Sequence, residues 1–148
     1  MVRAEVVTAK LAELGARIAR VRKHTPKTAA ALRGDQDALD LVSFNLMLCV
    51  QTSADIASHI VADEGWRPAL TLADAFERLH EGAVIRRSTA DAMARAAGLR
   101  NVVAHGYAGV DIELVFAAAS RGVADLDLFA AEVASWLQGR IATKAPGR

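Results

Sequence analysis

The chain has 148 residues, of which 53% are hydrophobic and only 5% aromatic, with ten glycines and three prolines. This composition favours packed helices with a core of Ala, Val, Leu and Ile, and argues against a turn-rich sandwich or barrel. With 18 Lys and Arg against 17 Asp and Glu, the net charge of +1 does not by itself call for a nucleic-acid partner. The length suits one domain, so we expect residues 1–148 to form a single helical domain.

A single cysteine, Cys49, excludes an internal disulfide framework and a cysteine-rich zinc module. It lies in an apolar run, where a buried and unreactive thiol is expected. The longest stretch without a charge, residues 41–54, is too short and too polar to span a membrane, which takes roughly 20 apolar residues. The first residues lack the apolar segment of a signal peptide. We therefore expect a soluble, cytoplasmic protein without a membrane partner.

The first predicted helix carries an apolar stripe with 4-3-4-3 spacing, formed by Val7, Leu11, Leu14, Ile18 and Val21. Thr25-Pro26 ends it, because the residue before a proline is pushed out of the helical region. Six cations and no acid lie between residues 14 and 34, namely Arg17, Arg20, Arg22, Lys23, Lys27 and Arg33. A basic groove and a solvated helix end are both compatible with this run.

The strongest helical pattern runs from Leu39 to Ile60 and is closed by Gly65. Over its first half, Leu41, Phe44 and Leu48 add a second apolar face. A helix that is apolar on two faces is expected at the centre of its bundle over that half.

Two capping signals predict the next helices. Thr71, with Asp74 three residues on, starts a helix that stops at Gly82, and Ser88 with Asp91 repeats this signal for a fourth helix. Helical patterns resume over 110–116 and 126–141, and strand-type alternation is essentially absent. The sequence therefore predicts an all-α, up-and-down bundle of about five to six helices.

Standard catalytic strings such as a P-loop, a nucleophile elbow or a zinc-protease motif are absent. Asp55, His59 and Asp63 fall at i, i+4 and i+8, a spacing that could place metal ligands on one helical face. Such spacing is common at exposed helical positions, so we expect no metal site.

Polar and ionisable side chains cluster in one segment, which contains Arg100, Asn101, His105 and the only tyrosine, Tyr107. In a helix, Asn101 and His105 lie at i and i+4 on one face with Arg100 at its edge, while the apolar residues 102–104 point inward. Such a set can form a catalytic site, or it can form a hydrogen-bonded cluster that fixes one helix against another. The residue types alone leave both interpretations open.

Arg100, four intervening residues, His105 and Tyr107 resemble the R-x4-H-x-Y signature of the HEPN superfamily, in particular its HepT-like toxin branch. The similarity extends to residues 50–60, 72–99 and 110–129, so it covers most of the chain. It implies a metal-independent ribonuclease without a cofactor, toxic to its own cell and paired with a minimal nucleotidyltransferase antitoxin. It also implies that the partner neutralises the toxin by adding AMP to the motif tyrosine, here Tyr107.

Metal-free cleavage of RNA needs a base for the 2′-hydroxyl, charge stabilisation of the phosphorane-like state and an acid for the leaving 5′-oxygen. His105 suits the proton transfers, Arg100 suits the phosphate, and Asn101 suits a supporting role in orienting the imidazole or the substrate. Asp55, which lies in the segment that resembles the family's second long helix, is a further candidate supporting residue. A single histidine cannot readily act as base and acid in one step, so we predict a two-fold homodimer with Arg100 and His105 near its interface.

Two other interpretations compete with this one. In the first, a non-catalytic HEPN dimer binds a nucleotide or a nucleotidyltransferase, and Arg100 and His105 are phosphate ligands. A basic rim around His105 would favour RNA, whereas an isolated small pocket would favour a nucleotide. In the second, the motif is a structural network, which full burial of Arg100 and His105 would support.

Overall fold

The computed structural model describes residues 3–105 and 111–144. The helices are α1 (Ala4–His24), α2 (Ala29–Arg33), α3 (Gln36–Glu64), α4 (Leu72–Glu81), α5 (Arg87–His105), α6 (Ile112–Ala117) and α7 (Val123–Lys144), with a π-helical turn, η1 (Ala118–Gly122), between α6 and α7. No β-strand occurs within these described residues. The predicted all-α fold is confirmed.

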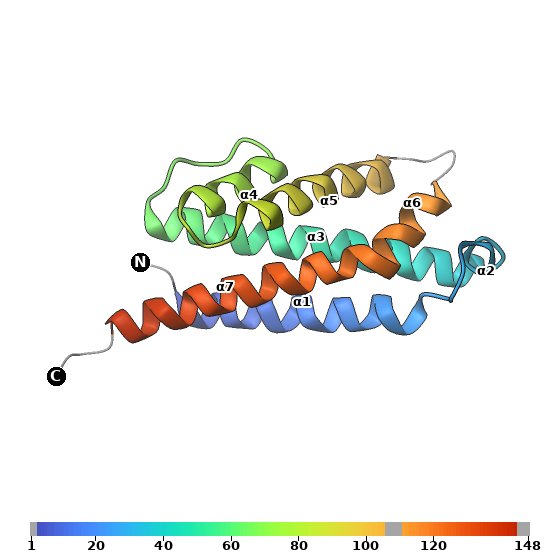
Figure 1. The fold of residues 1–148 in the computed structure, drawn as a ribbon, viewed down its shortest axis with the longest axis horizontal. Helices are drawn as coiled ribbons and strands as arrows, with labels where there is room; N and C mark the ends of the chain where they lie inside the picture. Colours follow the sequence, from blue (N-terminus) through green and yellow to red (C-terminus); the bar gives the residue numbers. More distant parts are fainter. Residues whose placement is uncertain (1–2, 106–110, 145–148) are drawn as a thin grey trace.

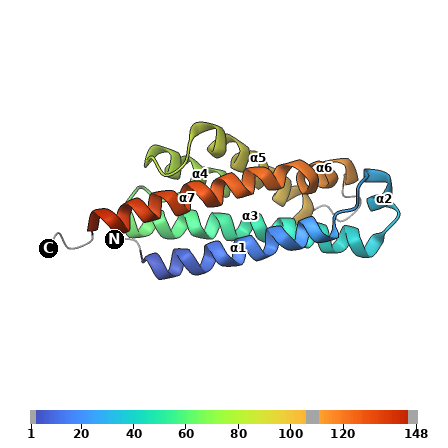
Figure 2. The same cartoon turned by 60° about the horizontal axis from the view of Figure 1, so that its bottom comes forward.

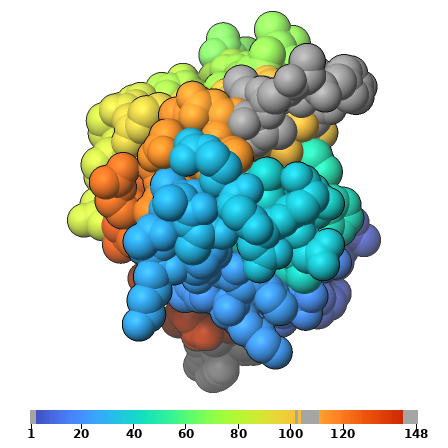
Figure 3. All heavy atoms as spheres, turned by 90° about the vertical axis from the view of Figure 1, so that its right-hand side faces the viewer, coloured from blue at the N-terminus to red at the C-terminus, as the bar shows by residue number. Residues whose placement is uncertain are grey.

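The four long helices α1, α3, α5 and α7 run along the molecule in alternating directions, as in an up-and-down bundle (Figure 1). α3 contacts α1 on one side and α4 and α5 on another, while α7 packs against α1 and α5. Turning the molecule shows the same order, with α3 between α1 and α5 (Figure 2). The short helices α2 and α6 meet at the end of the bundle where α3 begins (Figure 3).

Local chemistry accounts for most of the helix ends. The hydroxyl of Thr71 accepts a hydrogen bond from the backbone N–H of Asp74 at 3.0 Å, which confirms the predicted start of α4. Thr25, before the proline, is the C-cap of α1, and Gly65 ends α3 in the left-handed conformation with φ of 72°. Gly82 ends α4, and any side chain there would overlap the indole ring of Trp66.

The predicted start of α5 is slightly misplaced. The backbone N–H of Ala90 already donates to the carbonyl oxygen of Arg86, so the helix begins at Arg87 and Ser88 lies inside its first turn. The carboxylate of Glu132 on α7 binds the backbone N–H of Arg86 and the hydroxyl of Thr89. A contact from a distant helix therefore fixes this end, and the local sequence could not predict it.

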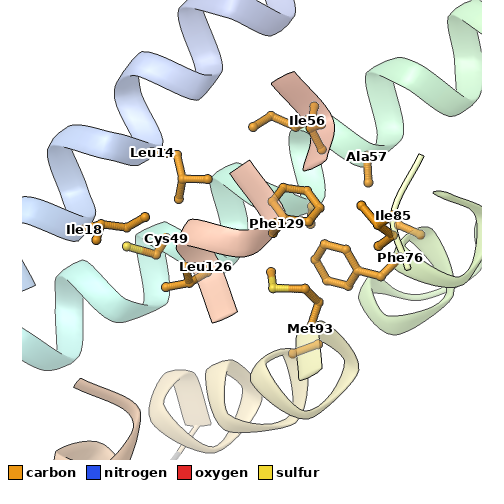
Figure 4. Packing of buried hydrophobic residues seen from close by; sticks show 14 of the residues in the cluster. Leu14, Ile18, Cys49, Ile56, Ala57, Phe76, Ile85, Met93, Leu126 and Phe129 are labelled. Carbon is orange, nitrogen blue, oxygen red and sulfur yellow. The ribbon is translucent and has the colours of Figure 1, made fainter. Parts of the chain in front are cut away.

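The core is formed mainly by side chains from α1, α3, α4, α5 and α7, with a few from α2, α6, η1 and the connection between α4 and α5 (Figure 4). At its centre, the rings of Phe76 and Phe129 meet edge to face, with centroids 5.6 Å apart and an interplanar angle of 86°. Cys49 is fully buried, and this burial raises the pKa of its thiol to about 12, as expected for an unreactive cysteine. Across the part of the chain described, none of the helices combines the length and apolar character needed to cross a membrane.

The second apolar face of α3 is not buried, although α3 is central to the bundle and packs against α1, α4, α5 and α7. Phe44 is 53% exposed, and Leu41 and Leu48 are only partly buried. The buried face of α3 is the other one, which includes Val42, Leu46 and other residues of the core. Leu41, Phe44 and Leu48, hereafter the α3 stripe, therefore form an apolar strip on the surface of the molecule.

Candidate active site

Arg100 lies near the end of α5 and reaches across to α3. Its Nη2 donates a hydrogen bond to Oε1 of Gln51 at 3.0 Å, and its Nη1 donates to Oδ1 of the neighbouring Asn101 at 3.2 Å. The residue is only partly buried, yet its Nε is inaccessible to solvent and has no hydrogen-bond partner among the described residues. The guanidinium is thus fixed by neutral amides rather than by a carboxylate.

Asp55 is linked to Arg100 through Gln51. Nε2 of Gln51 donates to Oδ1 of Asp55, one helical turn further along α3, at 3.3 Å. This bond fixes the orientation of the amide, so that its oxygen points toward Arg100. The predicted supporting residue Asp55 thus lies in the same hydrogen-bonded series as Arg100. The intermediate residue, Gln51, was missed by the sequence reasoning.

Asn101 is exposed, next to Arg100 on α5. Arg100 is only partly buried, so the full burial that would support the structural interpretation is not seen at this residue. α5 extends to His105, whose side chain lies outside the described residues, as does the whole of Tyr107. The predicted roles of His105 and Tyr107 therefore stay predictions.

The α3 stripe continues directly into the residues that hold Arg100. Leu41, Phe44, Leu48, Gln51 and Asp55 follow one another at intervals of three, four, three and four along α3. Residues at this spacing share one face of a helix. An exposed apolar strip and the amide that fixes Arg100 thus lie on a single face of the molecule.

A groove with a volume of about 690 Å³ lies between α3, α5 and the α6–η1 segment, and Arg100 is one of its lining residues. Its surface is largely apolar and includes many small side chains. The lining residues are Leu46, Met47, Val50, Ala92, Met93, Arg95, Ala96, Leu99, Arg100, Val103, Leu114, Ala117, Ala118, Arg121, Gly122, Asp125 and Leu126. The groove ends beside the last turns of α5, where the predicted catalytic residues occur.

The basic run of residues 14–34 does not converge on Arg100. It lies on α1, on α2 and in the connection between them, and α3 separates α1 from α5 (Figures 1 and 2). Arg22 and Arg33 form ion pairs with Asp127 and Glu113, and Arg17 donates to the amide oxygen of Asn45. The simpler interpretation, a solvated and partly paired helix end, agrees with these contacts.

The candidate metal ligands on α3 are not gathered into a site. In residues 3–105 and 111–144, no group of three or more His, Cys, Asp and Glu side chains is placed to hold a metal ion. Asp55 is engaged with Gln51, and a carboxylate oxygen of Asp63 accepts a hydrogen bond from the backbone N–H of Arg3.

Comparison with known proteins agrees with the resemblance found in the sequence. The model of the ribonuclease HepT-like family matches residues 14–133. The mRNA nuclease HepT of Shewanella oneidensis is 27% identical over 90 residues, which are 61% of this chain and 68% of that protein.

Solved structures show the same fold at low sequence identity. A tri-AMPylated HEPN toxin of Shewanella oneidensis, in complex with an MNT antitoxin, superimposes with a TM-score of 0.81 at 22% identity, covering 88% of this chain and 97% of the toxin. YutE of Bacillus subtilis, a cytosolic protein of unknown function, gives a TM-score of 0.82 at 12% identity, covering 95% of this chain and 94% of YutE.

Proposed function

The chain belongs to the ribonuclease HepT-like family, and from this premise we propose that it is a metal-independent RNA endonuclease and the toxin of a toxin–antitoxin pair. The observation that carries the proposal is the state of Arg100. Its guanidinium is fixed by Gln51 but has no carboxylate partner among the described residues, whereas the more deeply buried Arg78 is paired with Asp74 and Glu81. A positioned cation without a counter-ion is suited to a phosphate.

In the proposed mechanism, Arg100 binds the phosphate oxygens and stabilises the charge that develops on them. His105 moves protons, because an imidazole titrates near neutral pH. A base takes the proton of the 2′-hydroxyl while its oxygen attacks phosphorus and forms the 2′,3′-cyclic phosphate. The bond to the 5′-oxygen breaks, and an acid gives this oxygen the proton with which it leaves as a 5′-hydroxyl. Asn101 donates or accepts hydrogen bonds beside Arg100, and Gln51 with Asp55 keeps the guanidinium in place.

The same site favours a homodimer. One chain supplies one motif histidine, whereas this reaction uses both a base and an acid. A two-fold interface through the α3 stripe would cover exposed Phe44 and bring Gln51 and Arg100 of each copy close to the other. The exposed stripe supports such an interface because apolar strips beside polar sites are typical of protein–protein contacts.

Light scattering tests the dimer directly. We expect the wild type to be a dimer at micromolar concentration, and Phe44→Glu to be a folded monomer with little RNA cleavage. Leu128→Glu is the matched control, because Leu128 on α7 is also exposed, at 44%. A monomeric wild type that still cuts RNA would remove the dimer from the proposal.

Neutralisation by a minimal nucleotidyltransferase is the second part of the proposal. Addition of AMP to the hydroxyl of Tyr107 releases pyrophosphate from ATP and places a bulky anion two residues from His105. That anion would repel and block an RNA phosphate at Arg100. Intact-mass analysis after incubation with the partner and ATP should show added AMP on the wild type and none on Tyr107→Phe; an equal mass increase on both would contradict the assignment.

The decisive experiment is induced expression without any neighbouring gene, followed by assay of the purified protein on labelled RNA in EDTA. We expect toxicity and cleavage from the wild type and from His24→Ala, a control histidine on α1, and neither from His105→Ala. A folded wild-type dimer that is harmless and leaves RNA intact would instead favour the non-catalytic nucleotide-binding protein. Cleavage that stops in EDTA would contradict metal independence alone.

A further inference from the structure

The groove beside Arg100 is large and apolar enough to receive a ligand. Its volume of about 690 Å³ is within the range of roughly 300–1,000 Å³ for ligand sites. Leu46 and Val50 of α3 contribute to it from one side and Leu126 of α7 from another. The facing walls of α5 and η1 carry small residues, including Ala96 and Ala118, so space remains between them.

Charges at the groove indicate the kind of ligand. Arg95 on α5 and Arg121 on η1 are exposed lining residues, and neither forms an ion pair or hydrogen bond with another described residue. Arg100, with its unpartnered Nε, lines the same groove. Only one acidic residue, Asp125, is among the lining residues, so cations outnumber acids by three to one. An anionic ligand with an apolar or aromatic part therefore fits the groove.

The π-helical turn shapes one wall. In η1, residues 118–122 depart from α-helical hydrogen bonding, and Ser120 Oγ donates to the carbonyl oxygen of Phe116. Turns of this type occur frequently at functional sites. Here the turn contributes Ala118, Arg121 and Gly122 to the groove, so the irregular backbone presents a cation and two small residues to the same space.

We propose that this groove binds one nucleotide of a single-stranded RNA, with the base between α5 and η1 and the flanking phosphates on Arg95, Arg121 and Arg100. The inference rests on the proposed function, because it extends the substrate site from the cleaved phosphate to a neighbouring base. A strand fits better than a free nucleotide, since Arg95 and Arg100 are separated by about 7.5 Å along α5, at a rise of 1.5 Å per residue. Phosphates that recur along a strand can contact both.

Binding is best measured in a His105→Ala background, where the RNA should stay intact. Two groove variants test the charge and the space separately: Arg121→Ala removes a cation, and Ala96→Trp fills the groove. Arg20→Ala and Ala16→Trp, at exposed positions on α1, are the matched controls. The probes are a short fluorescein-labelled single-stranded RNA of mixed sequence, free AMP as a competitor, and the same RNA with 4-thiouridine for crosslinking.

We expect each groove variant to weaken RNA binding by about tenfold, as for loss of a phosphate contact or a base-binding surface, while both controls bind normally. Crosslinks should map to residues 92–103 or 114–126. Circular dichroism checks the fold, and Arg121→Ala, a surface change, still tests the groove if Ala96→Trp does not fold.

Unchanged affinity in the groove variants, or crosslinks confined to other helices, would overturn the inference. Displacement of the RNA by equimolar AMP would overturn it in favour of a free-nucleotide site. If the wild type cuts RNA while the groove variants bind normally, the groove inference fails alone. If the wild type neither binds nor cuts RNA, both proposals fail.

Discussion

The region around α4 and the region around the groove differ in whether their charged side chains are paired and their apolar side chains are buried. Around α4, the side chain of Arg78 is only 8% exposed and is held by Asp74 and Glu81, and the carboxylate of Glu132 accepts hydrogen bonds from two neighbours. Near the groove, Arg100 has no carboxylate partner among the described residues, and Leu114 is 50% exposed.

The difference shows which region has its charged and apolar groups satisfied by contacts within the chain. Paired charges and a closed core need nothing further from outside, whereas a fixed but uncompensated cation beside exposed apolar side chains is typical of a surface that binds a partner. Changes around α4 should therefore reduce stability, and changes near the groove should reduce binding or cleavage while the fold persists.

The largest effect is expected in the core. Phe129→Ala removes the ring that packs edge to face on Phe76, and should lower the free energy of unfolding by about 3–5 kcal/mol in urea titrations. Leu128→Ala, on the exposed side of the same helix, should cost less than about 1 kcal/mol. Similar losses at both positions would mean that this core is not the stabilising part of the bundle.

Arg100→Ala should reduce activity while leaving stability nearly unchanged. We expect cleavage of RNA to fall by about 100- to 1,000-fold, because the charge that stabilises the phosphorane-like state is lost. Arg100→Lys keeps the charge but not the forked donor geometry and should recover only part of the rate. The midpoint of thermal unfolding should stay close to that of the wild type; a large drop would make Arg100 a structural residue.

Glu132→Gln should show that the region around α4 depends on pH. Burial raises the pKa of Glu132, but hydrogen bonds from Thr89 and Arg86 outweigh it and hold the pKa below its usual value of 4.5. The ionised carboxylate therefore stabilises the fold above pH 4.5, and this contribution is lost as the pH falls through the lowered pKa.

We expect Glu132→Gln to cost about 1–3 kcal/mol at neutral pH, and the difference from wild type to shrink as the pH falls through the lowered pKa of Glu132. Glu13→Gln, at an exposed position on α1, is the control and should have little effect at either pH. A difference that is independent of pH would contradict the role assigned to the charge.

The smallest effect is expected at Gln51. Removing its amide in Gln51→Ala frees the guanidinium of Arg100, and should lower the rate of RNA cleavage by about tenfold without changing the fold. Gln36→Ala is a matched control, because Gln36 also donates to a carboxylate one turn further along α3, that of Asp40, but holds no arginine. Equal rates in both variants would show that Arg100 needs no positioning.

Features that depend on residues close together in the chain could be predicted from the sequence. The Thr71 cap, the proline after Thr25 and the left-handed Gly65 act within a few residues, so the ends of α1, α3 and α4 could be predicted from local chemistry. The sequence also singled out Arg100, through its spacing from His105 and Tyr107, and Asn101 beside it, and the structure joins these two side chains by a hydrogen bond.

The remaining features depend on residues far apart in the chain. Arg100 and Gln51 are 49 positions apart, so their hydrogen bond could not be predicted, although the i, i+4 spacing of Gln51 and Asp55 was a signal that could have been noticed. Periodicity also could not distinguish an apolar face that packs inside the bundle from the α3 stripe, because both are apolar at helical spacing. The helical patterns over 110–116 and 126–141 did not locate the π-helical turn between them.

That turn makes the number of residues between α6 and α7 as important as their identity. A π-helical turn holds one residue more than an α-helix joining the same two ends. Deleting Ser120 would therefore give a continuous α-helix that leaves α6 and α7 in place, whereas inserting a residue would rotate α6 relative to α7 by about 100°, the angle of one residue. Buried Val115 and groove-lining Leu114 would then change direction together. The segment should accept many substitutions at Ser120, and its deletion more readily than an insertion.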